Sequence, residues 1–404
     1  MVTEQISVSA SFDLRSHWAT INWPQCQKNV QRLQARIVQA TKRERWNKVK
    51  ALQHLLTRSF SAKSLAVKRV TENKGKWTPG VDGQIWQTST QKSQAIVSLR
   101  QRGYRPQPLR RVHILKSNGK KRPLGIPTIK DRAMQALYLM GLEPVAETTA
   151  DNHSYGFRPY RSGADAISQV FKTLCGWGRR PEWILEGDIK SCFDAISHEW
   201  LMDAIPIERN ILKKWLKAGF MEKQKLYVTK TGTPQGSIIS PVLANMALDG
   251  MESVLYQQFG KKGTKKRKQS GVHLIRYADD FVITGKTKEI LEEQVRAVIE
   301  TFLKQRGLTL SAEKTTITHI EQGFDFLGQN IRKYKSKLII KPSAKSIHRL
   351  LKRVKDVIGK NQAATQETVI KLLNPQIRGW AYYHRHVCAR KSYEKVDNEI
   401  FSSL

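Results

Sequence analysis

Two adjacent aspartates interrupt an apolar stretch of the sequence, IRYADDFVITG at residues 275–285. For the dipeptide alone, a pair of solvated turn residues is the commoner case. Here, however, strand-like apolar residues flank Asp279 and Asp280 on both sides, and adjacent carboxylates repel each other while desolvation raises their pKa values. A bound cation would relieve that cost, and Mg²⁺ is usually held by one or two carboxylates together with substrate phosphates. The residue types therefore predict a magnesium site.

A second acidic segment, EGDIKSCFDAI at residues 186–196, offers the further carboxylate that such a site needs. Two ions about 3.5–4 Å apart stabilise both the attacking and the leaving oxygen in phosphoryl transfer. Asp188 is preferred because it ends a short apolar strand predicted over 182–189, and Glu186 and Asp194 are the alternatives within the segment. Asp188, Asp279 and Asp280 are thus the candidate metal ligands.

Strands and turns must bring these residues together, and the sequence predicts several. Asp279 and Asp280 are expected at the tip of a hairpin formed by two short apolar runs. Apolar spacing and turn residues predict the other elements: basic helices over 25–70, a hairpin over 106–127, a helix over 129–147, a strand and then one long helix within 226–259, a helix running into a strand over 291–310, and a hairpin over 323–342.

The remaining segments are predicted to be more exposed. The basic run 260–271 is expected to be a solvated loop. An all-helical domain is predicted from Ser343, with a helix break at Asn374–Pro375.

Charge is the strongest global feature, since 70 Lys and Arg against 34 Asp and Glu give a net charge of +36. This excess predicts a polyanionic partner, most simply a nucleic acid. The absence of an 18-residue apolar run and of a signal-like N-terminus argues against a membrane protein. None of the four cysteines forms a C-x-x-C pair, so a reduced, cytoplasmic protein without a zinc ribbon is expected.

The ordered blocks resemble one family. YADD between apolar strands resembles the catalytic hairpin of reverse transcriptases, and DIKSCFDAI, TPQGSIISPVLANMAL, GLTLSAEKT and FDFLG resemble further palm blocks in the same order. KRPLGIPTIKDRAMQ and SYGFRPYRSGADAI resemble the fingers blocks of group II intron-encoded reverse transcriptases, or maturases, and RGWAYYHR resembles their thumb, or X, domain. The resemblance covers roughly residues 70–400, and the ordered set is far more specific than any single block.

The resemblance implies roles for individual residues. Asp188, Asp279 and Asp280 match the catalytic aspartates that bind two Mg²⁺ ions, and Phe193 matches the aromatic gate that excludes a ribose 2′-OH. Lys314 matches the lysine that gives a proton to the leaving pyrophosphate.

Other matched positions are expected to contact substrate. Gln235 and Gly236 match the loop beneath the templating pair and the incoming nucleotide. Lys116, Arg122 and Arg158 are candidates for the triphosphate, with Arg122 preferred because guanidinium binds phosphate in a bidentate fork.

The expected fold is α+β, a right-hand polymerase with fingers, a palm built on a small antiparallel sheet, and a helical thumb/X domain. The expected boundaries are 1–75 for a basic helical extension, 76–180 for the fingers, 181–340 for the palm and 341–404 for the thumb. The family's C-terminal endonuclease has no counterpart in the sequence, so second-strand DNA cleavage is not expected.

The expected function is that of an RNA-directed DNA polymerase that binds its group II intron RNA, assists splicing and copies the intron into target DNA from dNTPs. The alternatives are a splicing-only maturase and another cellular reverse transcriptase that serves defence or sequence diversification. The oligomeric state is left open.

Overall fold

The computed structural model describes residues 18–115, 119, 121–176, 180–261 and 263–403. These residues form two compact units. The first unit takes its described residues from 1–150 and 191–247, and the second from 151–190 and 248–404. The domain boundaries expected from the sequence remain predictions.

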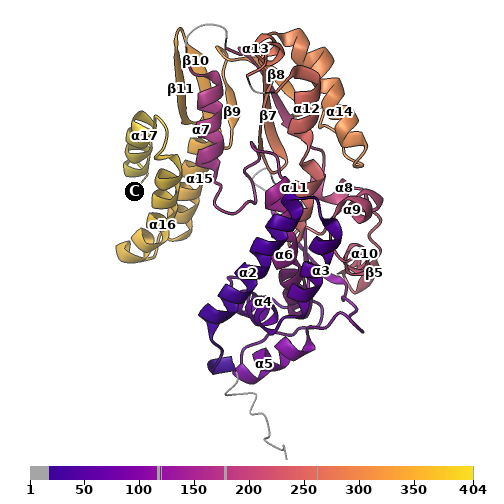
Figure 1. Ribbon diagram of the computed structural model, residues 1–404. Helices are drawn as coiled ribbons and strands as arrows, with labels where there is room; N and C mark the ends of the chain where they lie inside the picture. Colours follow the sequence, from indigo (N-terminus) through magenta and orange to yellow (C-terminus); the bar gives the residue numbers. More distant parts are fainter. Residues whose placement is uncertain (1–17, 116–118, 120, 177–179, 262, 404) are drawn as a thin grey trace, which may run out of the picture. The chain divides into compact units, whose positions relative to one another are not determined.

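Helices dominate the first unit (Figure 1). Helices α2 (Trp23–Lys42), α3 (Trp46–Arg58) and α4 (Phe60–Glu72) pack with one another and against α6 (Ile129–Thr149), and α5 is Ser89–Ser98. Asn22 and Thr128 cap α2 and α6 by accepting hydrogen bonds from backbone N–H groups in the first turns. Residues on every face of α6 are buried, which makes it the central helix of this unit.

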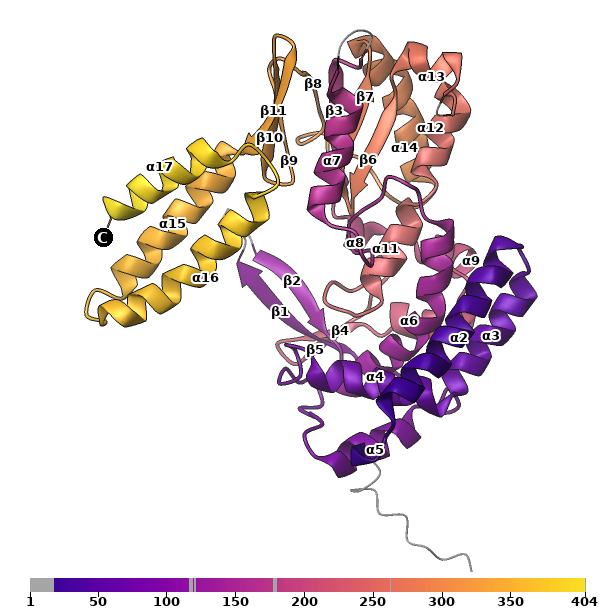
Figure 2. The same ribbon diagram turned by 60° about the vertical axis from the view of Figure 1, so that its left-hand side comes forward.

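A four-stranded sheet completes the first unit, in the order β2-β1-β4-β5. Its strands are β1 (Leu109–Leu115), β2 (Lys121–Ile126), β4 (Phe220–Glu222) and β5 (Lys225–Tyr227), and β1 and β2 form the predicted antiparallel hairpin (Figure 2). The remaining helices of this unit are α8 (Cys192–Ala195), α9 (His198–Ala204), α10 (Arg209–Leu216) and α11 (Ser240–Leu248), which reaches the boundary between the units.

The second unit contains the sheet that carries the three aspartates. Its strands are β3 (Trp183–Asp188), β6 (His273–Tyr277), β7 (Asp280–Gly285) and β8 (Thr316–His319), in the order β6-β7-β3-β8. Helix α7 (Gly163–Leu174) packs its apolar side against this sheet and against a second one, β11-β10-β9, in one shared core. The second sheet consists of β9 (Phe324–Phe326), β10 (Gln329–Tyr334) and β11 (Lys337–Pro342).

Further helices of this unit pack beside the sheet β6-β7-β3-β8, which one of them, a π-helix, contacts at β3 and β7. They are α12 (Met251–Phe259), α13 (Lys265–Ser270) and a π-helix, η1 (Ile290–Val295), that continues directly into α14 (Arg296–Lys304).

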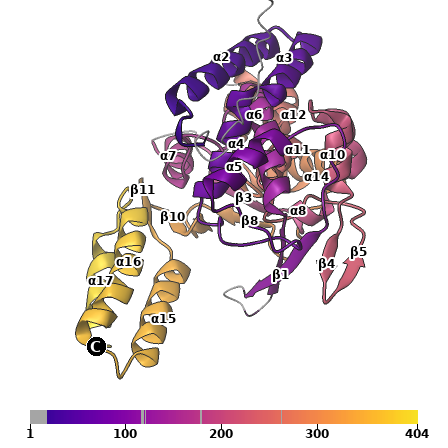
Figure 3. The same ribbon diagram turned by 90° about the horizontal axis from the view of Figure 1, so that it is seen from below.

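The C-terminal helices α15 (Ala344–Lys360), α16 (Gln366–His384) and α17 (Arg390–Phe401) lie side by side around their own apolar core (Figure 3). His384 ties this group to β10, because its ring is fully buried and bonds Ser346 Oγ at 3.1 Å and Gln329 Oε1 at 3.0 Å. Within the part of the chain that is described, no helix is both long and apolar enough to cross a membrane.

Three sequence-based expectations about elements were wrong. The basic run 260–271 contains a helix, α13, because Arg267 is buried, where it stacks on the Tyr256 ring and contacts His273 Nδ1 at 2.9 Å. The helix expected after TPQG is divided at Gly250, whose φ of 95° separates α11 from α12. Helix α16 runs through Pro375 unbroken, because packing against α15 outweighs the local cost of proline.

Candidate active site

The two aspartates lie at a tight hairpin between β6 and β7. Tyr277 pairs with Asp280, so only Ala278 and Asp279 form the connection. Ala278 has a φ of 56°, which is the left-handed conformation that two-residue hairpin turns require and that residues with a Cβ rarely adopt. The surrounding structure must therefore hold this turn in place.

A buried arginine helps to fix the conformation of this turn. The side chain of Arg276 in β6 is fully buried, and its guanidinium donates to the carbonyl oxygen of Ala278 at 3.2 Å and to Asp249 Oδ1 at 2.5 Å. Burial raises the pKa of Asp249 to about 6, although the positive charge of Arg276 opposes that rise. The sequence analysis did not identify Arg276, even though a lone arginine inside the apolar run LIRY was a visible signal.

Strand β3 places Asp188 directly across from Asp280 in the antiparallel pair that it forms with β7. Residues paired in this way project from the same face of a sheet, so the two carboxylates share one face. Next to Asp188, a Cβ at Gly187 would overlap the Phe281 ring, so only glycine allows β3 and β7 to pair here.

Lys314, in the segment that follows α14, contacts the carboxylate of Asp188. Ser311 N donates to Asp188 O at 2.8 Å, and Lys190 N donates to Thr309 O at 3.0 Å, which fastens the segment to the end of β3. The Lys314 ammonium then donates to Asp188 Oδ2 at 2.8 Å. This hydrogen bond raises the pKa of Lys314, despite some desolvation, and the negative charges of Asp188, Asp280 and Asp279 add to the rise.

The same charges act on Asp280. Desolvation raises its pKa, the carboxylates of Asp279 and Asp188 raise it further, and Lys314 opposes them, so that the pKa of Asp280 is about 6 although the residue remains exposed. A surplus of negative charge therefore collects at this end of the sheet.

The two alternatives to Asp188, Glu186 and Asp194, are less suited to hold a metal together with Asp279 and Asp280. Glu186 shares the Asp188 face of β3, but its Oε1 accepts hydrogen bonds from Thr316 and Thr318 at 3.4 and 3.3 Å. Asp194 belongs to α8 in the first unit, where its carbonyl oxygen accepts from Thr231 Oγ1 at 3.0 Å.

The donor set suits a hard divalent cation, because it consists of carboxylate oxygens with excess negative charge. Among the described residues no three acidic, histidine or cysteine side chains are gathered closely enough to hold a metal by themselves. Mg²⁺ takes few protein ligands and completes its shell with water and substrate phosphates. Asp188, Asp279 and Asp280 are the residues that could hold it.

A loop that the sequence analysis assigned to the fingers packs against the hairpin tip. Tyr155 N donates to Arg276 O at 2.9 Å, and a Cβ on Gly156 would lie 2.9 Å from Tyr277 C and overlap Ala278 N. Just beyond, Phe157 and Tyr160 have φ values of 58° and 57° and are largely exposed. Two aromatic side chains thus lie in strained conformations on a loop joined to the turn of the aspartates.

Arg158, expected to contact the triphosphate, lies in this loop but is buried. Its Nη1 donates to the carbonyl oxygens of Asp151 and Ser154 at 2.9 and 3.1 Å. These bonds shape the loop, so they favour a structural role for Arg158.

The first unit holds the other candidate residues. Arg122 is exposed on β2, and Gly125 N of the same strand donates to Gln235 O at 2.7 Å. Gly236 has a φ of 105°, and a Cβ there would lie 2.8 Å from Gly125 O. The hairpin strand and the loop with Gln235 and Gly236 are therefore in direct backbone contact. Lys116 lies outside the described residues.

Phe193 lies in α8, and its carbonyl oxygen accepts from Thr233 N at 2.6 Å. The side chain is half-buried. It is five positions after Asp188 in the chain, which limits the distance between their Cα atoms to roughly 18 Å.

Three family models match the chain. One described as reverse transcriptase (RNA-dependent DNA polymerase) matches residues 114–331. Another described as the N-terminal domain of reverse transcriptase matches 18–99, and the group II intron maturase-specific domain matches 347–404.

Individual proteins are similar over much of the chain. Protein YkfC of Escherichia coli is 37% identical over 67% of this chain and 80% of its own length. The group II intron-encoded protein LtrA of Lactococcus lactis is 33% identical over 66% of this chain and 54% of its own length, so the chain spans about half of that relative. Among solved structures, a telomerase from Candida albicans aligns with a TM-score of 0.43 and 14% identity over 75% of this chain and 56% of its own, a likeness too weak to inform the function.

Proposed function

Since the chain belongs to the reverse transcriptases, in the branch with the group II intron maturase-specific domain, we propose that it copies its intron RNA into DNA after assisting the splicing of that RNA. The observation that carries the catalytic part is the pairing of Asp188 with Asp280 across β3 and β7, with Lys314 bonded to Asp188. The net charge of +36 supports binding to RNA and to target DNA.

Asp188, Asp279 and Asp280 would hold the two Mg²⁺ ions. Magnesium supplies a lower pKa for the primer 3′-OH and neutralises charge on the attacking and leaving oxygens. The reaction breaks the O–H bond of the primer 3′-OH, whose proton passes to solvent, forms a bond between the 3′ oxygen and the α-phosphorus of a dNTP, and breaks the bond between that phosphorus and the leaving pyrophosphate.

The other residues act by binding and by proton transfer. Lys314 keeps a proton on Nζ, because its pKa is raised, and gives that proton to the leaving pyrophosphate. Arg122 binds phosphate oxygens of the dNTP. The backbone at Gln235 and Gly236 lies beneath the base pair that is being formed and supports it. The Phe193 ring excludes a ribose 2′-OH. The proposed substrate contacts do not include Arg158, because its guanidinium is buried against carbonyl groups.

Primer extension tests the proposal. Purified wild-type protein, Asp279→Ala and the matched surface variant Glu293→Gln are given an annealed RNA template, a DNA primer, dNTPs and Mg²⁺. We expect Mg²⁺-dependent DNA synthesis by the wild type and by Glu293→Gln but not by Asp279→Ala, while all three bind RNA equally. Equal synthesis by Asp279→Ala would refute the assignment of the metal ligands.

The main alternative is a maturase that assists splicing without copying RNA. Folded wild-type protein that binds intron RNA tightly, promotes splicing and makes no DNA would favour it. The paired carboxylates and Lys314 argue against this alternative, since RNA binding alone gives no reason for a surplus of negative charge in a basic protein.

A further inference from the structure

A cationic cavity in the first unit has no role in the function described above. It has a volume of about 840 Å³ and lies among α3, α4, α6, α10 and the loop 99–103. None of the candidate residues Arg122, Phe193, Gln235 and Gly236 lines it. Its size falls within the range of pockets that bind small organic groups.

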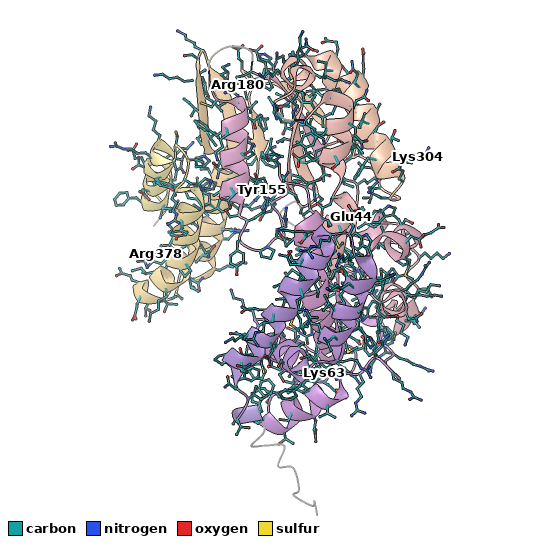
Figure 4. All side chains as sticks on the ribbon, in the orientation of Figure 1. Glu44, Lys63, Tyr155, Arg180, Lys304 and Arg378 are labelled. Carbon is teal, nitrogen blue, oxygen red and sulfur yellow. The ribbon has the colours of Figure 1, made fainter. Side chains whose placement is uncertain are left out.

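Its lining divides into an apolar floor and a basic rim. The floor consists of buried residues: Leu99, Met134, Leu137, Tyr138 and Ile211. The rim carries six cations: Arg58, Lys63, Arg100, Arg102, Lys213 and Lys214. Lys63 of α4, labelled in Figure 4, is half-buried, whereas the other five are exposed.

These cations lack carboxylate partners, since within the described residues none of the six forms a salt bridge and the lining contains no acidic residue. Some are fixed by neutral groups, because Lys214 Nζ donates to Tyr104 O at 2.7 Å and Arg100 Nε donates to Val97 O at 3.1 Å. Burial lowers the pKa of Lys63, and the positive charges of Arg100 and Arg58 lower it further. The mutual repulsion of these cations destabilises the folded protein, and an anion bound in the cavity would offset it.

The floor indicates which anion. A bare phosphate would use the rim and make no contact with the apolar floor. An aromatic or apolar surface next to cations is how proteins hold unpaired nucleotides, whose bases stack while their phosphates meet Arg and Lys. A second cavity of about 240 Å³ shares His54, Thr57, Gln101 and Tyr138 with the first and extends the space for neighbouring groups.

We propose that this cavity binds an unpaired nucleotide, with its base against the apolar floor and its phosphates on the basic rim. The source is a nucleotide that a folded RNA extrudes from its helix, and a free nucleotide is the other source of the same chemistry. The RNA source rests on the proposed function, because it takes RNA as the partner of this chain.

Two kinds of variant separate this site from general electrostatic attraction. Lys63→Gln, Arg100→Gln and Lys213→Gln together remove three rim charges. Thr57→Trp fills the cavity from α3 without changing the charge. The matched control removes three exposed charges from α2, by Lys28→Gln, Arg32→Gln and Lys42→Gln.

Fluorescence anisotropy in about 0.15 M salt measures binding to two RNA probes, a fully paired duplex and the same duplex with one bulged nucleotide. We expect the wild-type protein to prefer the bulged probe by roughly tenfold. The rim variant and Thr57→Trp should both lose this preference, and the α2 variant should weaken both probes equally and keep it. Competition by AMP would assign the cavity to free nucleotides, and no competition would assign it to RNA.

Two outcomes would overturn the proposal. One is equal affinity of the wild type for both probes together with no binding of AMP. The other is an unchanged preference in both the rim variant and Thr57→Trp. Primer extension on an unstructured template is the separate readout for the polymerase, so its loss in Asp279→Ala with the bulge preference retained would leave the cavity assignment intact.

Discussion

Replacing Asp280 with asparagine should stabilise the metal-free protein while it abolishes polymerisation. The pKa of Asp280 rises from 3.8 to about 6 on folding, because of desolvation and the charges of Asp279 and Asp188. A fully shielded shift of this size would cost the folded state roughly 3 kcal/mol at neutral pH. Since the residue is exposed to solvent, we expect about 1 kcal/mol, or an increase of about 1 °C in Tm for Asp280→Asn in a chain of 404 residues.

The effect should depend on pH in a defined direction. Well below pH 3.8 the carboxyl is protonated in both the folded and the unfolded state, so the wild type and the variant should unfold alike. As the pH rises from 3.8 to about 6, the unfolded chain releases a proton that the folded wild type still holds, so the stability of the wild type falls relative to the variant. Above about pH 7 the difference should stay constant.

Thermal unfolding followed by circular dichroism in EDTA, at about pH 4 and about pH 7.5, measures the difference. Glu293→Gln serves as the control, because it removes an exposed carboxylate from η1. Adding Mg²⁺ should stabilise the wild type more than Asp280→Asn, since the variant lacks one proposed ligand. A variant no more stable than the wild type at about pH 7.5, or an advantage as large at pH 4 as at pH 7.5, would refute the electrostatic reasoning.

Three further predictions concern the chemistry and its support. Lys314→Gln should slow single-nucleotide addition by about a hundredfold and remove the alkaline limb of the pH–rate profile, and an unchanged rate would exclude proton donation by this residue. Phe193→Val should raise the incorporation of NTPs relative to dNTPs by about tenfold in kcat/KM ratios, and unchanged selectivity would remove its role as a gate. Gly156→Ala should displace the turn at Ala278 and reduce primer extension by at least about tenfold, with RNA binding retained. Gly359→Ala is the control, because the structure has open space at that position, and it should not reduce primer extension. Equal activity of the two variants would contradict the packing argument.

Much of the local structure follows from the sequence. The two short apolar runs on either side of Asp279 and Asp280 predicted the β6–β7 hairpin, and the apolar run before Asp188 predicted β3. Helical spacing predicted α2 to α4 and the C-terminal helices, since each must bury one apolar side. Errors occurred where non-local packing overrode local preference, as when burial of Arg267 ordered a basic segment or helix packing retained Pro375.

The roles of single charged residues were less accessible, because an arginine in a sequence does not reveal what surrounds it. Arg122 and Arg158 were both candidates for phosphate, with Arg122 preferred, yet Arg158 is buried against carbonyl groups whereas Arg122 is exposed on a hairpin. The sequence did not indicate a role for Arg276, although its guanidinium donates a hydrogen bond to the carbonyl oxygen of Ala278 in the turn. Burial decides between these roles, and it depends on elements far away in the chain.

The amino-acid sequence supplies the carboxylates, the lysine, the excess of basic residues, and the strands and helices that follow from short-range apolar periodicity. Tertiary structure alone decided that β3 lies between β7 and β8, which places Asp188 opposite Asp280 and within reach of Lys314. It also gathered six cations from separate segments around one apolar floor. The physical reason is that periodicity reports which side of an element is buried, whereas charges interact through distances that only the pairing of distant segments sets.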